Sequence, residues 1–176
     1  DDGLVIISAH DSDDSVATRA IVLDFNGKNF VEWHNCTFVG SNSAFVIGNT
    51  AYATATAYEG VVINNCTVIA TGYTWGVKFA LNASTTPTAS GIKITRCTIQ
   101  GGLQILHDTN ATAHVNTKIL IDSNRILGIG GVNPLQIDRN TGTTTYSVGG
   151  ITISNNFIQS AFQYGISASY IKNTTN

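Results

Sequence analysis

A pattern of eight residues recurs five times along the chain, and this repeat limits the possible folds more than any other feature. Each copy reads apolar-x-apolar-x-x-(Cys/Asn)-x-apolar, as in Val31 to Phe38 and Ile151 to Ile158. A period of about 30 residues is typical of repeat architectures. The Cys or Asn positions are Cys36, Cys66, Cys97, Asn124 and Asn156, so the spacings are 30, 31, 27 and 32 residues.

The first half of each copy alternates apolar and polar residues, which predicts a β-strand. An Asx-rich corner interrupts the alternation, and a second apolar alternation follows each corner. We expect the Thr-, Ala- and Gly-rich stretches 49–60, 82–91, 109–117 and 139–150 to connect one coil with the next. The second strands are predicted at Phe45/Ile47, Val77/Phe79, Leu103/Ile105, Leu135/Ile137 and Tyr164/Ile166.

A single coil of this kind cannot bury its apolar residues, whereas coils stacked about 4.8 Å apart bury equivalent residues on one another. Asn at a corner suits a left-handed backbone, and stacked side-chain amides can hydrogen-bond from coil to coil. No amphipathic helical pattern of useful length occurs. The sequence therefore predicts an all-β solenoid.

The five copies resemble the short parallel β-helix repeat shared by pectate lyases, polygalacturonases, alginate epimerases and phage tailspikes. The resemblance implies a right-handed parallel β-helix, a single-stranded solenoid of about five to six coils. It covers roughly residues 19–170 of a single domain, 1–176, which is either complete or part of a longer β-helix protein. Residues 1–18 are expected to form a partial coil, and residues 171–176 a tail.

The surface composition favours an extracellular or virion-surface protein. Charged residues make up 11% of the chain, against about 25% in a typical soluble protein, and Asn, Thr, Ser and Gly take their place. The net charge of -2 gives no electrostatic case for nucleic acid. No apolar run approaches the roughly 20 residues of a membrane span.

The three cysteines share one position of the repeat. The Cα atoms of neighbouring cysteines would lie about one strand spacing apart, which is within the Cα–Cα range of a disulfide. We expect Cys36, Cys66 and Cys97 to be stacked and buried. A metal or redox role is the alternative.

Glycan hydrolysis needs two carboxyl groups within about 5–9.5 Å. The resemblance implies that lyases and epimerases use carboxylates with a basic residue, sometimes with Ca²⁺ bridging the sugar acid. In the predicted outward rows, no two carboxylates lie on adjacent coils, and the catalytic motifs of the resembled enzymes are missing. The outward rows predicted for the first strand are Glu32, Val62, Lys93, Leu120 and Thr152, and beside it His34, Asn64, Thr95, Asp122 and Ser154. Four polar residues remain as candidates, at the ends of second strands in successive coils. They are either catalytic residues or solvated residues at strand ends. The set is His107, Asp108, Asp138 and Arg139.

Loop aromatics beside amides and hydroxyls suit the recognition of sugar rings, whose C–H faces are apolar. The alternative is that some of them cover the core. The candidates for ligand binding are Tyr52, Tyr58, Tyr73, Trp75 and Tyr146. We expect no metal cofactor, although the acidic cluster Asp11, Asp13 and Asp14 could offer oxygen ligands to Ca²⁺ instead of forming a solvated turn.

The predicted outward rows also contain aliphatic residues, which suggests that a loop or a second subunit covers them. Phage tailspikes with this repeat are trimers, so the resemblance implies a homotrimer. The aliphatic residues are Val46, Val62, Leu106 and Leu120.

Three functions remain open at this point. The first is recognition of polysaccharide by a surface fibre such as a tailspike or adhesin, strengthened by the avidity of a trimer. The second is a polysaccharide lyase, glycoside hydrolase or epimerase. The third is a structural solenoid that acts as a spacer or filament unit.

Overall fold

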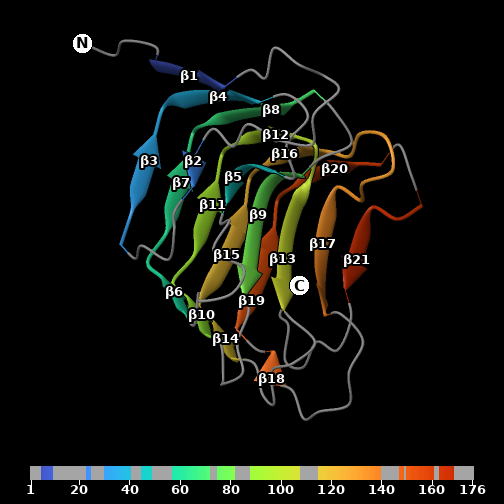
Figure 1. Cartoon of the computed structure of the whole chain (residues 1–176). Coiled ribbons are helices and arrows are strands. Elements are labelled where there is room, and N and C mark those ends of the chain that lie inside the picture. The colour runs from blue at the N-terminus through green and yellow to red at the C-terminus, as the bar shows by residue number, and fades with distance from the viewer. Residues whose placement is uncertain are drawn as a thin grey trace.

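The computed structural model describes residues 5–9, 23–24, 30–40, 45–48, 57–71, 75–81, 88–107, 115–139, 147–148, 150–160 and 163–168. Within these ranges the regular elements are all strands, and every strand pairing is parallel (Figure 1). This confirms the predicted all-β class. None of the described residues belongs to a helix long and apolar enough to cross a membrane.

Sheets 1 and 2 contain the two halves of the repeated pattern. Sheet 1 consists of β3 (Glu32–His34), β7 (Val62–Asn64), β11 (Lys93–Thr95), β15 (Ile119–Asp122) and β19 (Ile151–Ser154). Sheet 2 consists of β1 (Val5–Ala9), β4 (Cys36–Gly40), β8 (Thr67–Ala70), β12 (Thr98–Gln100), β16 (Arg125–Leu127) and β20 (Phe157–Gln159).

Sheets 3 and 4 complete each turn of the chain. Sheet 3 consists of β2 (Leu23–Asp24), β5 (Phe45–Gly48), β9 (Trp75–Leu81), β13 (Leu103–His107), β17 (Leu135–Arg139) and β21 (Ile166–Ala168). Sheet 4 consists of β6 (Ala57–Glu59), β10 (Thr88–Ser90), β14 (Val115–Thr117) and β18 (Ser147–Val148). The chain visits sheets 1, 2, 3 and 4 in that order and then begins again, which is the order of a solenoid.

Sheet 4 was not foreseen, because its strands lie within the stretches that were predicted to be loops. These strands have two or three residues each and carry no apolar alternation. Their pairing follows from the coils on either side: Ala89 of β10 lies between Tyr58 of β6 and Asn116 of β14. The stacking of neighbouring coils thus overrides a weak local preference.

The core is made of apolar rows that run through the stack. In sheet 2, Phe38, Val68, Ile99 and Ile126 lie in register and are almost completely buried. In sheet 3, Val77, Leu103 and Leu135 do the same. Burial of each such side chain stabilises the fold by about 1.5–3 kcal/mol, so the repeated apolar positions are the main source of stability.

The corner between sheets 1 and 2 depends on a left-handed residue in every described coil. Asn35, Asn65 and Asn155 have φ between 53° and 57°, a conformation that asparagine tolerates better than most residues. Arg96 and Ser123 take the same conformation in the other two coils. Immediately after this residue comes the repeated Cys or Asn, which therefore turns inward at the same place in each coil.

One prediction about the outward rows is wrong. Val46 is predicted to face outward, but Gly48 is the residue of β5 that pairs with Lys78, and Val46 is completely buried. Gly76 in the neighbouring strand is buried as well, and a Cβ there would lie 2.8 Å from Cγ2 of Ile99. The second residues of β5 and β9 therefore lie toward the core, so simple alternation fails near the start of these strands.

Candidate functional site

The outward face of sheet 1 carries two rows of side chains in strict register, as predicted. We call the row nearer the corner the polar row, and the row beside it the mixed row. The polar row is His34, Asn64, Thr95, Asp122 and Ser154. The mixed row is Glu32, Val62, Lys93, Leu120 and Thr152.

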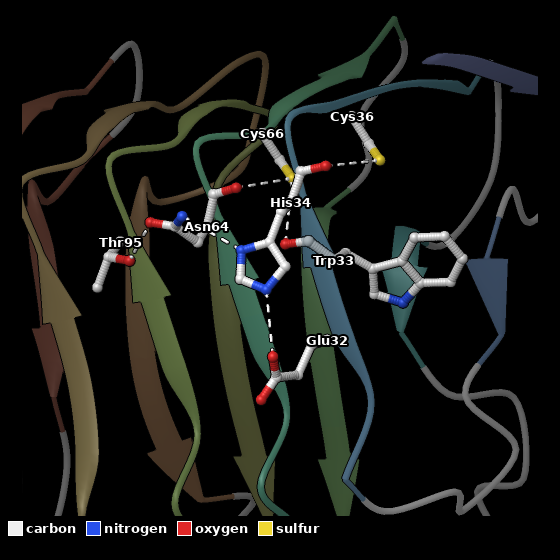
Figure 2. A network of polar contacts seen from close by, with 7 residues as sticks. All are labelled: Glu32, Trp33, His34, Cys36, Asn64, Cys66 and Thr95. Atoms are coloured by element: carbon white, nitrogen blue, oxygen red, sulfur yellow. Dashed lines mark hydrogen bonds and ion pairs between the residues drawn. The ribbon is translucent and has the colours of Figure 1, made fainter. Parts of the chain in front are cut away.

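The first three members of the polar row form one hydrogen-bonded network with Glu32 (Figure 2). The Thr95 hydroxyl donates to Oδ1 of Asn64 at 2.8 Å. The amide nitrogen of Asn64 must therefore be the atom that faces His34, and it donates to Nδ1 at 3.3 Å. Nε2 of His34 then carries the proton and donates to the carboxylate of Glu32 at 3.2 Å. The network thus fixes the orientation of the His34 ring, with Nδ1 toward Asn64 and Nε2 toward Glu32.

The other end of the polar row is organised around the carboxylate of Asp122. The hydroxyl of Ser154 donates to it at 2.6 Å, and the hydroxyl of Ser123 and the side-chain amide of Asn155 donate at 2.9 Å. These hydrogen bonds, that of Ser154 foremost, hold the pKa of Asp122 below its ordinary value, and the nearby charge of Arg96 lowers it further. Asp122 is therefore a fixed anion at neutral pH.

The two carboxylates of this face are too far apart for hydrolysis of a glycosidic bond. Glu32 belongs to β3 and Asp122 to β15, three strands away in sheet 1. At about 4.8 Å per strand the separation is roughly 14 Å, beyond the 5–9.5 Å that an acid and its partner carboxylate span. This face of sheet 1 can therefore bind a ligand through its amide and hydroxyl groups and through single charged side chains.

The predicted catalytic set lies on a different sheet. The backbone register of β13 and β17 places His107 opposite Arg139, and Leu106 opposite Asp138. Asp108 lies outside the described residues, and the description does not extend to the side chains of the other three. Neighbouring coils thus bring the strand ends together, and the catalytic role of the set remains a prediction.

Of the five aromatic candidates, Trp75 is the one whose side chain is described. It is half-buried at the start of β9, and its Cζ3 would lie 3.2 Å from a Cβ placed on Gly102. The ring therefore packs against the turn at Gly102. The backbone of Tyr58 lies in β6, whereas Tyr52, Tyr73 and Tyr146 lie outside the described residues, so ligand binding by these side chains is still a prediction.

The three thiols occupy the inward side of the corner, as expected. Cys36, Cys66 and Cys97 are buried and carry no disulfide. Cys66 donates to the carbonyl of Asn64 and Cys36 to that of His34, as Figure 2 shows. A hydrogen bond with Cys66, together with burial, raises the pKa of the Cys97 thiol, and burial raises that of Cys36. The same hydrogen bond with Cys97, together with those to backbone groups, lowers the pKa of Cys66 to about 6. Cys36 and Cys97 are therefore protonated at neutral pH, and Cys66 is the buried thiol of the row with thiolate character.

Among the residues that the structure describes, no group of three or more His, Cys, Asp or Glu side chains could hold a metal ion. The predicted Ca²⁺ ligands Asp11, Asp13 and Asp14 lie outside the described ranges.

Neither the family models, nor the curated proteins, nor the solved structures gave a match to this chain. Both rows of sheet 1 can be placed from the sequence, but neither contains the paired carboxylates that mark a glycan-cleaving site. The sequence signal that could have indicated this site is in the mixed row. There, residues that can form hydrogen bonds alternate with aliphatic residues from one copy of the repeat to the next.

Proposed function

We propose that the chain is a right-handed parallel β-helix that recognises polysaccharide on the outward face of sheet 1. The observation that carries the proposal is the pair of registered rows. One row offers hydrogen-bonding groups on five successive coils, and the other places Val62 and Leu120 beside them, both half-buried. Sugar rings combine an apolar C–H face with hydroxyl groups, so they match both rows at once.

The regular spacing of the rows also favours a polymer. Equivalent side chains recur at about 4.8 Å along the stack, so an extended glycan could repeat the same contact from coil to coil. Each contact is weak, but linked contacts strengthen one another through their high effective concentration. The pre-formed network around Asn64 and the fixed anion at Asp122 lower the cost of ordering these groups on binding.

The wider setting of the proposal rests on the resemblance of the repeat. In this proposal the chain is part of a surface fibre of the tailspike or adhesin type. The fibre is a homotrimer at the cell exterior or on a virion. The low share of charged residues, 11%, agrees with such a surface. The molar mass in solution, measured by light scattering, tests the assembly, and a value of one chain would refute the trimer.

A second candidate function is supported by the register of sheet 3. His107 lies opposite Arg139, with Asp138 one residue before Arg139. A base, a cation and a carboxylate on neighbouring strands suit a polysaccharide lyase or epimerase. A glycoside hydrolase would need a second carboxyl group, for which Asp108 is the sequence candidate. Release of reducing ends or unsaturated uronates from a panel of bacterial and plant polysaccharides would establish this activity, and His107→Ala and Asp138→Asn should then abolish it.

Binding to the same panel tests the proposed recognition. Asn64→Ala removes the link between His34 and Thr95, and we expect it to weaken the affinity for the bound polysaccharide about fivefold to thirtyfold, as the loss of one to two hydrogen bonds of about 1 kcal/mol each would do. Thr67→Ala is the matched control, because Thr67 also points outward but belongs to sheet 2. Equal affinity of both variants and the parent would place the glycan elsewhere. No binding to any polysaccharide would leave the structural solenoid as the better description.

A further inference from the structure

A groove of about 300 Å³ lies on the outer face of sheet 2, away from the two rows of sheet 1. Its floor crosses three strands in register, since Gln100 of β12 pairs with Leu127 of β16, and Leu127 pairs with Gln159 of β20. The volume is at the lower end of the range typical of small-molecule sites. The residues that line it are Gln100, Leu127, Gly128, Ile129, Gln159 and Ser160.

The wall of the groove is a turn that is held in place by its own contacts. The N–H of Gly128 donates to the carbonyl of Gln159 at 2.9 Å, and the N–H of Val132 donates to that of Ile129 at 3.1 Å. A Cβ on Gly128 would lie 2.6 Å from the carbonyl oxygen of Val132, so glycine allows the chain to fold tightly here. The groove is thus part of the folded structure and needs no rearrangement to form.

The lining chemistry is an amide at each end with aliphatic side chains between them. Nε2 of Gln100 donates to the carbonyl of Ala70 at 3.1 Å, which fixes the direction of this side chain at one end of the groove. Gln159 is exposed at the other end. Leu127 and Ile129 are half-buried and offer an apolar surface between the two amides.

None of the lining residues is ionisable. Arg125, in the neighbouring outward row of sheet 2, is directed to the ring of Phe157, 5.6 Å from its centroid. A ligand that is held by two amides and two aliphatic side chains, without a charged partner, should itself be neutral. A charged ligand would lose hydration here without gaining an ion pair.

We infer that this groove is a subsite for one neutral sugar ring, with the C–H face on Leu127 and Ile129 and hydroxyl or acetamido groups on Gln100 and Gln159. The inference rests on the proposed recognition of polysaccharide and adds the location and the class of one ring. It predicts that a neutral hexose or N-acetylhexosamine, and not a uronic acid, occupies this position.

The test is titration of ¹⁵N-labelled protein with methyl glycosides of glucose, galactose, mannose, N-acetylglucosamine and glucuronic acid. At least one neutral glycoside should shift the side-chain amide signals of Gln100 and Gln159, and the glucuronide should not. Gln159→Ala should weaken the binding about fivefold, as expected for one hydrogen bond. Absence of shifts with all four neutral glycosides, or equal binding of the glucuronide, would overturn the inference.

A matched pair of variants separates this inference from the proposed function. Leu127→Lys places a charged chain in the groove and should abolish the binding of the glycosides. Ile69→Lys makes the same change in the same outward row, because Ile69 pairs with Gln100 outside the lining, and should preserve it. If polysaccharide binding survives in Leu127→Lys and is lost in Asn64→Ala, the groove inference fails while the proposed function stands. If no glycan binds the parent protein, both fail.

Discussion

The backbone N–H of Cys97 donates a hydrogen bond of 2.9 Å to the side-chain oxygen of Asn124 on the next coil. Asn124 is almost completely buried, and its amide nitrogen donates to the carbonyl of Ile94 at 2.8 Å and to Oδ1 of Asn156 at 3.0 Å. One side chain therefore links three coils at the corner. This is the point where the row of thiols gives way to a row of amides.

Asn124→Ala should lower the free energy of unfolding by about 2–4 kcal/mol, because it leaves the N–H of Cys97 buried without a partner and removes the hydrogen bonds to the carbonyl of Ile94 and to Oδ1 of Asn156. Chemical denaturation followed by circular dichroism measures the change. Asn124→Cys should cost clearly less, since the sulfur of Cys97 itself accepts from the N–H of Cys66 at 3.4 Å in the equivalent place. If the two variants were equally unstable, the shared role of thiol and amide would be refuted.

The sequence predicted the corner well, because its signal is local and repeated. A Cys or Asn at a fixed offset, preceded by a left-handed residue and followed by an apolar one, can be recognised in each copy separately. Register then follows, since Thr37, Thr67 and Thr98 must pair once the corners stack. The strands of sheet 4 could not be predicted in this way, because their pairing is imposed by the coils on either side.

The candidate sites were harder to predict, because a site depends on which outward residues meet and how they are oriented. The rows of His34 and Glu32 were placed correctly from the pleat. The order of donors along Thr95, Asn64 and His34 required the actual distances. The groove at Leu127 depends on the tight turn at Gly128, where a Cβ would lie 2.6 Å from the carbonyl oxygen of Val132.

Asp122 should make the protein sensitive to acid. The pKa of its carboxyl group lies below the ordinary value of 3.8 in the folded protein, so its contribution to stability is present above about pH 4 and is lost as the pH falls toward the folded pKa. Melting temperatures between pH 6 and pH 2 should therefore fall more steeply for the parent than for Asp122→Asn. Ser154→Ala removes the strongest donor and should give an intermediate slope. Parallel curves for all three proteins would contradict the assignment.

Lys118 lies at the corner between sheets 4 and 1, between β14 and β15. Three other coils have glycine at the equivalent position. Its φ is 56°, and Gly60, Gly91 and Gly150 have φ of 63°, 66° and 74°. A left-handed conformation costs a residue with a Cβ about 1–2 kcal/mol. Lys118→Gly should therefore raise the free energy of unfolding by several tenths to about 1 kcal/mol, after the greater chain entropy of unfolded glycine is subtracted.

The reverse substitution at the equivalent position is the control for Lys118. Gly91→Ala should destabilise the protein by about 1 kcal/mol or more, because it introduces the same conformational strain. Its new Cβ would also lie 3.4 Å from the backbone nitrogen of Gly60. Changes of the same sign in the two variants would show that the left-handed corner does not determine these stabilities.

The stacked thiols should be protected from alkylation in the folded protein. Cys66 and Cys97 are each 2% exposed and Cys36 is 8% exposed, so a reagent reaches them only after local or global opening. Iodoacetamide at pH 7 should modify none of them within the time in which it modifies all three in denaturant, as measured by mass spectrometry. Cys36 should react first as denaturant is added. Rapid modification of Cys66 without denaturant would contradict the buried corner.

Gln104 is the outward residue of β13, yet it is 6% exposed, and its Oε1 accepts no hydrogen bond from the described residues. Its Nε2 donates to Oε1 of Gln136 at 3.4 Å, which is long for such a bond. A buried acceptor without a partner costs about 1–3 kcal/mol, so the amide stabilises the fold less than an apolar group of similar size would. Gln104→Leu should therefore raise the free energy of unfolding by about 1 kcal/mol in chemical denaturation. Gln100→Leu is the matched comparison and should not, because it removes the satisfied bond to the carbonyl of Ala70. A loss of stability in Gln104→Leu as large as in Gln100→Leu would mean that the oxygen of Gln104 is satisfied in solution by a bound water, and that this water belongs to the fold.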